Sequence, residues 1–180
     1  MKKLLATLAT AAFLTVSSSF VSAASFSDIP QGHWAHDKVI AMADAGIVEG
    51  YGDGTYRGDN KITCTEFAKM AGNILVAVSP NFAADAKKLV EESSSDKPAT
   101  RFEVALICSE VYTKVKGNTP AASNIFSDVP ADHWAAKAVN LMGATEIMSG
   151  YGDGTFRGDK NMTRYEAALT LYALCQALTK

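Results

Sequence analysis

The chain of 180 residues has little extended hydrophobicity, and the first mainly apolar run is Leu4 to Val16. A membrane-spanning helix needs roughly 20 apolar residues, so this run is too short to be one. It follows Lys2 and Lys3 and precedes a stretch of small residues ending near Ala23, which is the pattern of a secretory signal peptide. We therefore predict that residues 1–23 are a signal peptide, that the protein is exported, and that no transmembrane segment remains after cleavage.

An excess of positive charge is also lacking. The chain has 17 lysines and arginines against 19 aspartates and glutamates, and loss of the signal peptide removes two lysines and no acid, so the net charge falls from −2 to −4. A weakly acidic chain without a basic run argues against nucleic acid as a partner. The same charge argues against electrostatic binding to anionic lipid.

Cysteine is scarce and does not form a framework. Cys64, Cys108 and Cys175 are odd in number and irregularly spaced, whereas a disulfide scaffold normally has an even number. We expect free thiols. No cysteine or second histidine stands at metal-ligand spacing from His33 or His133, so a zinc site is not expected.

Catalytic motifs are absent as well. No serine or cysteine lies in a recognisable nucleophile motif. Three glutamates that could serve as acids or bases, Glu66, Glu103 and Glu166, each follow a threonine by three residues, which is the pattern of a helix capping box. The sequence therefore predicts a protein that is not an enzyme and carries no cofactor.

What the chain does contain is a long internal repeat. Residues Phe26 to Glu66 and Phe126 to Glu166 align without a gap, and 21 of 41 positions are identical. Unrelated segments of ordinary composition would share about two or three. The identical positions are mostly polar, aromatic or glycine rather than aliphatic. This composition indicates a repeated surface site in addition to a repeated core.

Each repeat is predicted to be a helix, a long glycine-rich loop and a second helix that begins at a capping box. The segment between the two copies retains both helices and the capping box at Thr100 to Glu103 but has no G-Y-G-D-G-T loop. We therefore predict an all-α fold of three repeats, over residues 24–78, 79–118 and 119–180, in a pseudo-threefold arrangement. We expect the first helix of each repeat to lie at the centre.

Arg101 and Arg164 each stand one residue inside a predicted helix N-terminus. A cation is disfavoured there by roughly 0.3–1 kcal/mol, so local helix stability does not explain either arginine. The free N–H groups of a helix N-terminus attract anions. We expect each arginine to bind a carboxylate or phosphate there, with a surface arginine packed on a neighbouring side chain as the alternative.

Tryptophan and the glycine-rich loops supply the remaining candidate residues. Trp34 and Trp134 are expected to be buried in the core, to offer a surface on which a sugar ring stacks, or to do both, with one face packed and the edge open. The loop aspartates resemble the first ligand of an EF-hand, but position 5 is arginine and position 12 is cysteine or arginine, which excludes calcium binding of that kind. An Asx-turn is the alternative role for these aspartates.

The motifs F-S-D-V-P-x-x-H-W-A, G-Y-G-D-G-T-F-R-G-D and M-T-R-Y-E resemble the S-layer homology domain of bacterial envelope proteins. They are similar to the peptidoglycan-binding segments of outer-membrane tethering proteins in diderm Firmicutes. The resemblance implies a three-pronged spindle of three repeats, with a degenerate middle one here. It also implies noncovalent binding of peptidoglycan or a secondary cell-wall polysaccharide in grooves between the prongs.

The resemblance and the repeated pattern together give a set of glycan-binding candidates. They are Trp34, Asp53, Gly54, Arg57, Arg101, Trp134, Asp153, Gly154, Thr155, Arg157 and Arg164. Cys64 stands where the family has arginine, so we expect one competent groove around Arg164 with weaker neighbours. The predicted function is a noncatalytic wall-binding protein, with an envelope protein–protein interaction module as the alternative. The sequence leaves the oligomeric state open.

Overall fold

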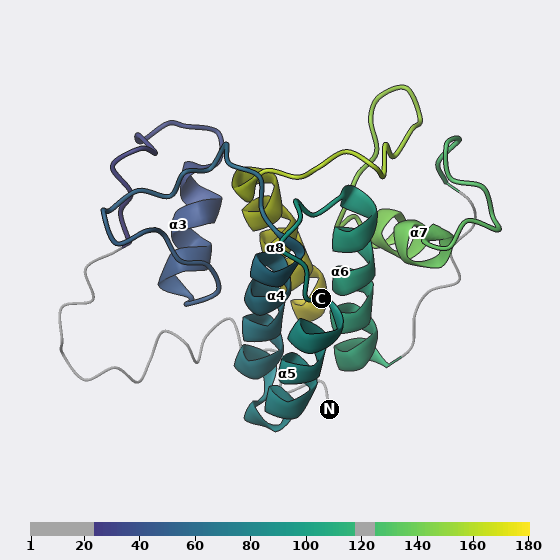
Figure 1. Ribbon diagram of the computed structural model, residues 1–180, viewed down its shortest axis with the longest axis horizontal. Coiled ribbons are helices and arrows are strands. Elements are labelled where there is room, and N and C mark those ends of the chain that lie inside the picture. Colours follow the sequence, from purple (N-terminus) through teal and green to yellow (C-terminus); the bar gives the residue numbers. More distant parts are fainter. Residues whose placement is uncertain (1–23, 118–124) are drawn as a thin grey trace.

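The computed structural model describes residues 24–117 and 125–180, and the signal peptide predicted for residues 1–23 lies outside them (Figure 1). The described residues form six α-helices and one short 3-10 helix, and no named strand. The elements are α3 (His36–Asp44), α4 (Cys64–Val78), η1 (Pro80–Phe82), α5 (Ala83–Glu92), α6 (Arg101–Lys116), α7 (Ala136–Ala144) and α8 (Arg164–Thr179). The all-α prediction is confirmed.

The three longest helices begin at the three capping boxes predicted from the sequence. The side chains of Thr63, Thr100 and Thr163 accept a hydrogen bond from the N–H of the glutamate three residues later. Each glutamate in turn accepts a bond from the N–H of its threonine, at 2.7–2.9 Å. A cap of this kind contributes about 1 kcal/mol, so the starts of α4, α6 and α8 are determined locally.

The second helices of the repeats form the centre of the molecule. Figure 1 shows α4, α6 and α8 side by side, with α3 on one side and α7 on the other. Our expectation that the first helices lie at the centre is therefore wrong. The physical reason is length together with burial: α4, α6 and α8 have 15 or 16 residues and bury eight, six and eight of them, whereas α3 and α7 have nine residues each and bury two and six.

The helices of the three repeats pack against one another in a cyclic order. Helix α5 packs on α4, α7 packs on α6, and α3, which is first in the chain, packs on α8, which is last. In each case the first helix of one repeat contacts the second helix of the preceding repeat. A side chain at the start of a central helix therefore faces the loop of the next repeat, and any groove there is built from two repeats.

Backbone hydrogen bonds join each loop to the helix start below it. Arg164 N donates to Asn60 O and Tyr165 N donates to the Gly58 carbonyl, both at 2.9 Å. The second loop meets α6 in the same way, because Arg101 N donates to Lys160 O at 3.0 Å. The loops are thus fixed to the central bundle at defined points, although they contain no regular structure.

Candidate functional site

The first glycine-rich loop is held by its own side chains. Asp53 Oδ1 accepts hydrogen bonds from Thr55 N at 3.0 Å and from the Thr55 hydroxyl at 2.6 Å. Asp53 Oδ2 accepts a bond from Arg57 Nη2 at 2.6 Å, and Arg57 Nε donates to the Thr55 hydroxyl at 3.1 Å. Gly54 takes a φ of +81°, a conformation that glycine adopts readily. This geometry is that of the Asx-turn alternative.

The second loop has the same arrangement. Asp153 accepts from Thr155 N at 3.1 Å, from the Thr155 hydroxyl at 2.6 Å and from Arg157 Nη2 at 2.6 Å. Gly154 has a φ of +80°. The candidate residues of the two loops are thus brought together within each loop, where aspartate and arginine bind each other at a half-exposed surface.

The Asp53 carboxyl is expected to titrate well below the usual aspartate range. The hydrogen bond from Thr55, together with that from Arg57, lowers the pKa of Asp53 to about 2. A depressed folded pKa means that the stabilising effect of the carboxylate is present above the unfolded pKa and is lost only as the pH falls through about 2. Carboxyl NMR of the native protein would measure this midpoint. Replacement of Thr55 by valine should raise it, and an unchanged midpoint would contradict the assignment.

The aspartate of each F-S-D motif anchors the loop from below. Asp28 Oδ1 accepts from Tyr56 N at 2.8 Å and Asp28 Oδ2 from Arg57 N at 2.7 Å. Asp128 makes the same two bonds in the second copy, each at 2.7 Å. These bonds hold Arg57 and Arg157 at a φ of 54°, which is uncommon for a residue with a side chain. Sequence analysis did not identify this role.

Arg164 lies beneath the first loop and is almost fully buried, at 4% exposure. Its Nε donates to the Tyr56 carbonyl at 3.0 Å, and its Nη2 donates to the Glu49 carbonyl at 2.7 Å. Its Nη1 is 3.9 Å from Glu66 Oε1. Two of its three nitrogens therefore bind neutral carbonyl oxygens, and Glu66 is its one anionic neighbour within salt-bridge distance in the described part of the chain.

Arg101 occupies the equivalent position beneath the second loop. Its Nε donates to the Phe156 carbonyl at 2.9 Å, and its Nη2 donates to the Ser149 carbonyl at 2.8 Å. The guanidinium carbon lies 4.5 Å from the centre of the Phe156 ring. Desolvation lowers the pKa of Arg101. Arg101 and Arg164 thus occupy equivalent positions beneath the two loops.

The helix N–H groups that we expected to attract an anion are already occupied. The first two N–H groups of α8, those of Arg164 and Tyr165, donate to loop carbonyls, and those of α6 do the same. The third is bonded to the capping threonine. The expectation of free N–H groups at these helix starts is therefore wrong, because the loop of the next repeat covers them. Any ligand would meet the arginine side chain rather than the helix end.

Cys64 begins α4 at the position that corresponds to the two arginines, and it has no glycine-rich loop above it because the middle segment lacks one. Burial and the neighbouring Glu103 carboxylate raise the pKa of the Cys64 thiol to about 11. Cys64, Cys108 and Cys175 are unpaired, as predicted. The two arginines thus stand beneath glycine-rich loops, and the cysteine stands at the helix start that has no such loop.

Both tryptophans are exposed, at 61% for Trp34 and 63% for Trp134. The alternative that they are core residues is therefore wrong. The edge of Trp34 contacts Tyr165 with ring centres 5.4 Å apart, and Trp134 contacts Phe102 in the same way at 5.5 Å. Each tryptophan thus packs on one side and leaves much of its surface open to solvent. Tyr165 and Phe102 were missed by sequence analysis, although each directly follows an arginine at a helix start.

An open groove adjoins Arg164. It has a volume of about 420 Å³ and runs between the first loop and α4, and we refer to it as the α4 groove. The residues of the groove that carry polar or aromatic groups are Glu49, Tyr51, Glu66, Lys69, Asn73 and Arg164. Arg164 is thus buried under the loop but forms part of the wall of a solvent-accessible groove.

A smaller hollow of about 280 Å³ lies on the outer side of the second loop. It is lined by Phe102, Asp128, His133, Arg157 and Lys160, among others. The His133 ring is 5.4 Å from the Trp134 ring, so the hollow is next to the exposed tryptophan. The hollow offers aromatic rings together with acidic and basic side chains. This combination suits a polar ligand that also contains rings.

The S-layer homology domain model matches residues 25–68 and 125–168. The chain belongs to the S-layer homology domain family. The two matches contain both tryptophans, both loops, Asp28, Asp128 and Arg164. Arg101 lies outside them, although its geometry is equivalent to that of Arg164.

Several S-layer homology proteins are similar to this chain. Outer membrane protein SlpA of Thermus thermophilus is 57% identical over 53 residues, 29% of this chain and 6% of that protein. The cellulosome-anchoring protein of Acetivibrio thermocellus is 35% identical over 45% of this chain and 18% of its own length. S-layer protein EA1 of Bacillus anthracis is 30% identical over 93% of this chain and 22% of its own length.

The chain spans only a small part of these relatives, 4–6% of the SlpA proteins. Membership of the S-layer homology family, with outer-membrane and S-layer relatives, points to the cell envelope or cell surface. The presence of an anchoring protein and S-layer proteins among the relatives supports a role in cell-surface anchoring. Within residues 24–117 and 125–180, no helix combines the length and hydropathy that a membrane span requires.

Proposed function

We propose that this protein is a noncatalytic anchor that binds a glycan of the cell wall, either peptidoglycan or a secondary polysaccharide, in a groove beside Arg164. The observation that carries the proposal is the α4 groove, in which a buried guanidinium and the exposed Lys69 meet a solvent-accessible hollow of about 420 Å³. Wall glycans carry carboxylates, and a cation held in a partly desolvated wall is suited to recognise one.

Rigidity of the arginine favours binding over a purely structural role. The two carbonyl bonds hold the Arg164 side chain in one conformation, so little conformational entropy is lost when a ligand arrives. Glu66 is 3.9 Å away and compensates only part of the charge, since its other oxygen accepts the N–H of Thr63. A ligand carboxylate near Lys69 would complete the neutralisation.

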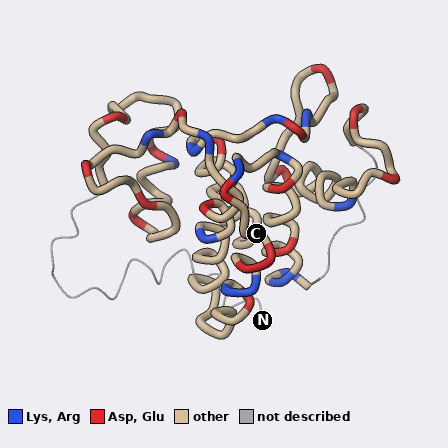
Figure 2. Tube along the Cα trace, in the orientation of Figure 1, with Lys and Arg blue, Asp and Glu red and all other residues tan. Residues whose placement is uncertain are grey.

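The exposed tryptophans are the second part of the proposed interface. Trp34 and Trp134 each present an indole next to a second aromatic ring and leave most of their surface exposed. An exposed indole of this kind is suited to stack on the apolar face of a sugar ring. Figure 2 shows lysine and arginine interspersed with aspartate and glutamate and no long stretch of one sign. Binding should therefore depend only modestly on salt, unlike that of a polybasic protein.

The double replacement Trp34→Ala and Trp134→Ala is expected to weaken binding to purified sacculi by about tenfold or more. Because both side chains are more than 60% exposed, stability should change little. Co-sedimentation with sacculi at a series of protein concentrations measures the affinity, and circular dichroism monitors the fold. Replacement of the exposed α5 residue Lys87 by alanine is the control. Equal sedimentation of the double variant and the parent would remove the tryptophans from the interface.

Sedimentation before and after acid removal of secondary polymer distinguishes the two classes of ligand. Binding that survives removal identifies peptidoglycan, and binding that is lost identifies the secondary polysaccharide. The rival role, docking to another envelope protein, predicts no binding to either preparation and capture of a protein partner from wall-free extract. Release of soluble muropeptides from sacculi would instead indicate an enzyme.

A further inference from the structure

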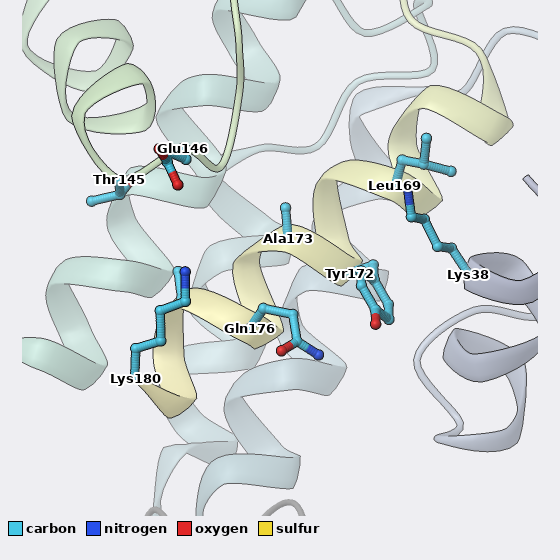
Figure 3. Close-up of a pocket in the computed structure, with 9 residues that line it drawn as sticks. Lys38, Thr145, Glu146, Leu169, Tyr172, Ala173, Gln176 and Lys180 are labelled. Atoms are coloured by element: carbon cyan, nitrogen blue, oxygen red, sulfur yellow. The ribbon is translucent and has the colours of Figure 1, made fainter.

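A second groove runs along α8, and we refer to it as the α8 groove. It has a volume of about 280 Å³. Figure 3 shows α8 as its floor, with Lys38 of α3 on one flank and Glu146, which follows α7, on the other. The residues that matter here are Lys38, Glu146, Leu169, Tyr172, Ala173 and Gln176. The floor is thus mainly apolar and aromatic, with Gln176 as a polar member, and Lys180 lies at the end of α8. Lys38 and Glu146 give the two flanks opposite charges.

The repeat relates the α8 groove to the α4 groove. Leu169 and Ala173 correspond to Lys69 and Asn73, which lie at the end of the α4 groove away from Arg164. The residues of α8 that line the α8 groove therefore begin at the positions that correspond to the last α4 residues lining the α4 groove. In the first copy the Asn73 amide donates to the carbonyls of Gly46 and Ile47, at 3.4 and 3.3 Å, and ties α4 to the loop. Alanine at 173 cannot do so, and the groove on α8 continues along the helix.

Glu146 adopts a backbone conformation that a glutamate rarely takes. Its φ is 58°, and the corresponding residue of the first copy is Gly46, with a φ of 68°. Glycine adopts this conformation without steric cost, whereas a residue with a Cβ does so seldom. The Glu146 side chain is exposed and, among the described residues, forms no ion pair. The stability of the backbone at position 146 therefore does not account for a glutamate, whereas a role of its side chain in the groove does.

We propose that the α8 groove binds the peptide stem of peptidoglycan, with Glu146 recognising an amino group and Lys38 a carboxylate. This inference rests on the proposed function and selects peptidoglycan among its ligands. A secondary polysaccharide that carries only acidic groups would be repelled by the Glu146 carboxylate, whereas a peptide stem carries both charges within one short segment.

The test compares two soluble fragments, the wall disaccharide with its tetrapeptide and the same disaccharide with its lactyl carboxyl as the simple amide, so that neither sugar carries a free carboxylate. Calorimetry with the parent is expected to show about tenfold tighter binding of the fragment with the peptide. Glu146→Gly and Lys38→Ala should each remove most of this difference and leave the affinity for the bare disaccharide unchanged. Lys137→Ala, at an exposed lysine of α7 outside the groove, is the matched control and should behave as the parent.

Glu146→Gly separates binding from folding, because glycine already occupies the corresponding position of the first copy. Its Tm should be no lower than that of the parent. Equal affinity of the parent for both fragments, or unchanged peptide binding by Glu146→Gly, overturns this inference while binding to whole sacculi persists. Failure of the parent to bind sacculi at all overturns the proposed function itself.

Discussion

Replacement of Gly158 by alanine is expected to destabilise the protein by about 3 kcal/mol or more. A Cβ at this position would lie 2.1 Å from two carbons of the Phe102 ring, far inside van der Waals contact. The ring has little room to move, because Phe102 is buried and packs against Phe156 and the edge of Trp134. Urea unfolding followed by circular dichroism would measure the loss.

Gly152→Ala is the matched control within the same loop. No atom lies within 4 Å of the Cβ that alanine would add there, and the residue does not have a left-handed φ. Its effect should stay within about 0.5 kcal/mol. The same contrast exists in the first copy, where a Cβ at Gly58 would lie 2.1 Å from the Tyr165 ring and one at Gly52 would meet nothing. Similar stabilities of the Gly152 and Gly158 variants would show that Phe102 can be displaced.

Arg164→Ala is expected to lower both stability and wall binding. It removes the donors to two loop carbonyls, each bond worth roughly 1.5–3 kcal/mol because the donor is charged, and we expect a loss of about 3 kcal/mol. Wall affinity measured well below the Tm should fall more than tenfold if the guanidinium contacts the ligand. Chemical unfolding and sedimentation with sacculi report on the two effects separately.

Arg157→Ala provides the comparison for Arg164→Ala. Arg157 is about half exposed, and its ion pair with Asp153 is an i,i+4 contact at the surface. Such pairs contribute about 0–1 kcal/mol, so the stability of this variant should be close to that of the parent. If Arg164→Ala lost stability but retained full affinity for sacculi, Arg164 would be purely structural and the proposed binding role would move to Lys69 and the tryptophans.

Local patterns predicted much of the fold. The capping boxes at Thr63, Thr100 and Thr163 mark the starts of the three central helices, because a cap depends on residues only three positions apart. The Asx-turn of Asp53 and Thr55 is equally local. Local patterns did not determine whether Trp34 and Trp134 are exposed. The start of an amphipathic helix is compatible with either a buried or an exposed indole.

The partners of the arginines were beyond the reach of local reasoning. Arg164 binds carbonyls 108 and 115 residues away in the chain, and Arg101 binds carbonyls 48 and 55 residues away. The partial positive charge of a helix N-terminus correctly indicated that these arginines do not stabilise the helices in which they stand. It did not reveal that the loop of another repeat would already occupy the helix N–H groups.

From its sequence alone, this protein is a repeated helix–loop–helix chain with duplicated aromatic, glycine and arginine positions, since repetition and capping are properties of neighbouring residues. Only the tertiary structure decided that the second helices form the centre and that each repeat places its loop on the helix start of the repeat before it. The physical reason is that the long helices α4, α6 and α8 pack against one another at the centre, and the loops bond to the helix ends that this packing presents.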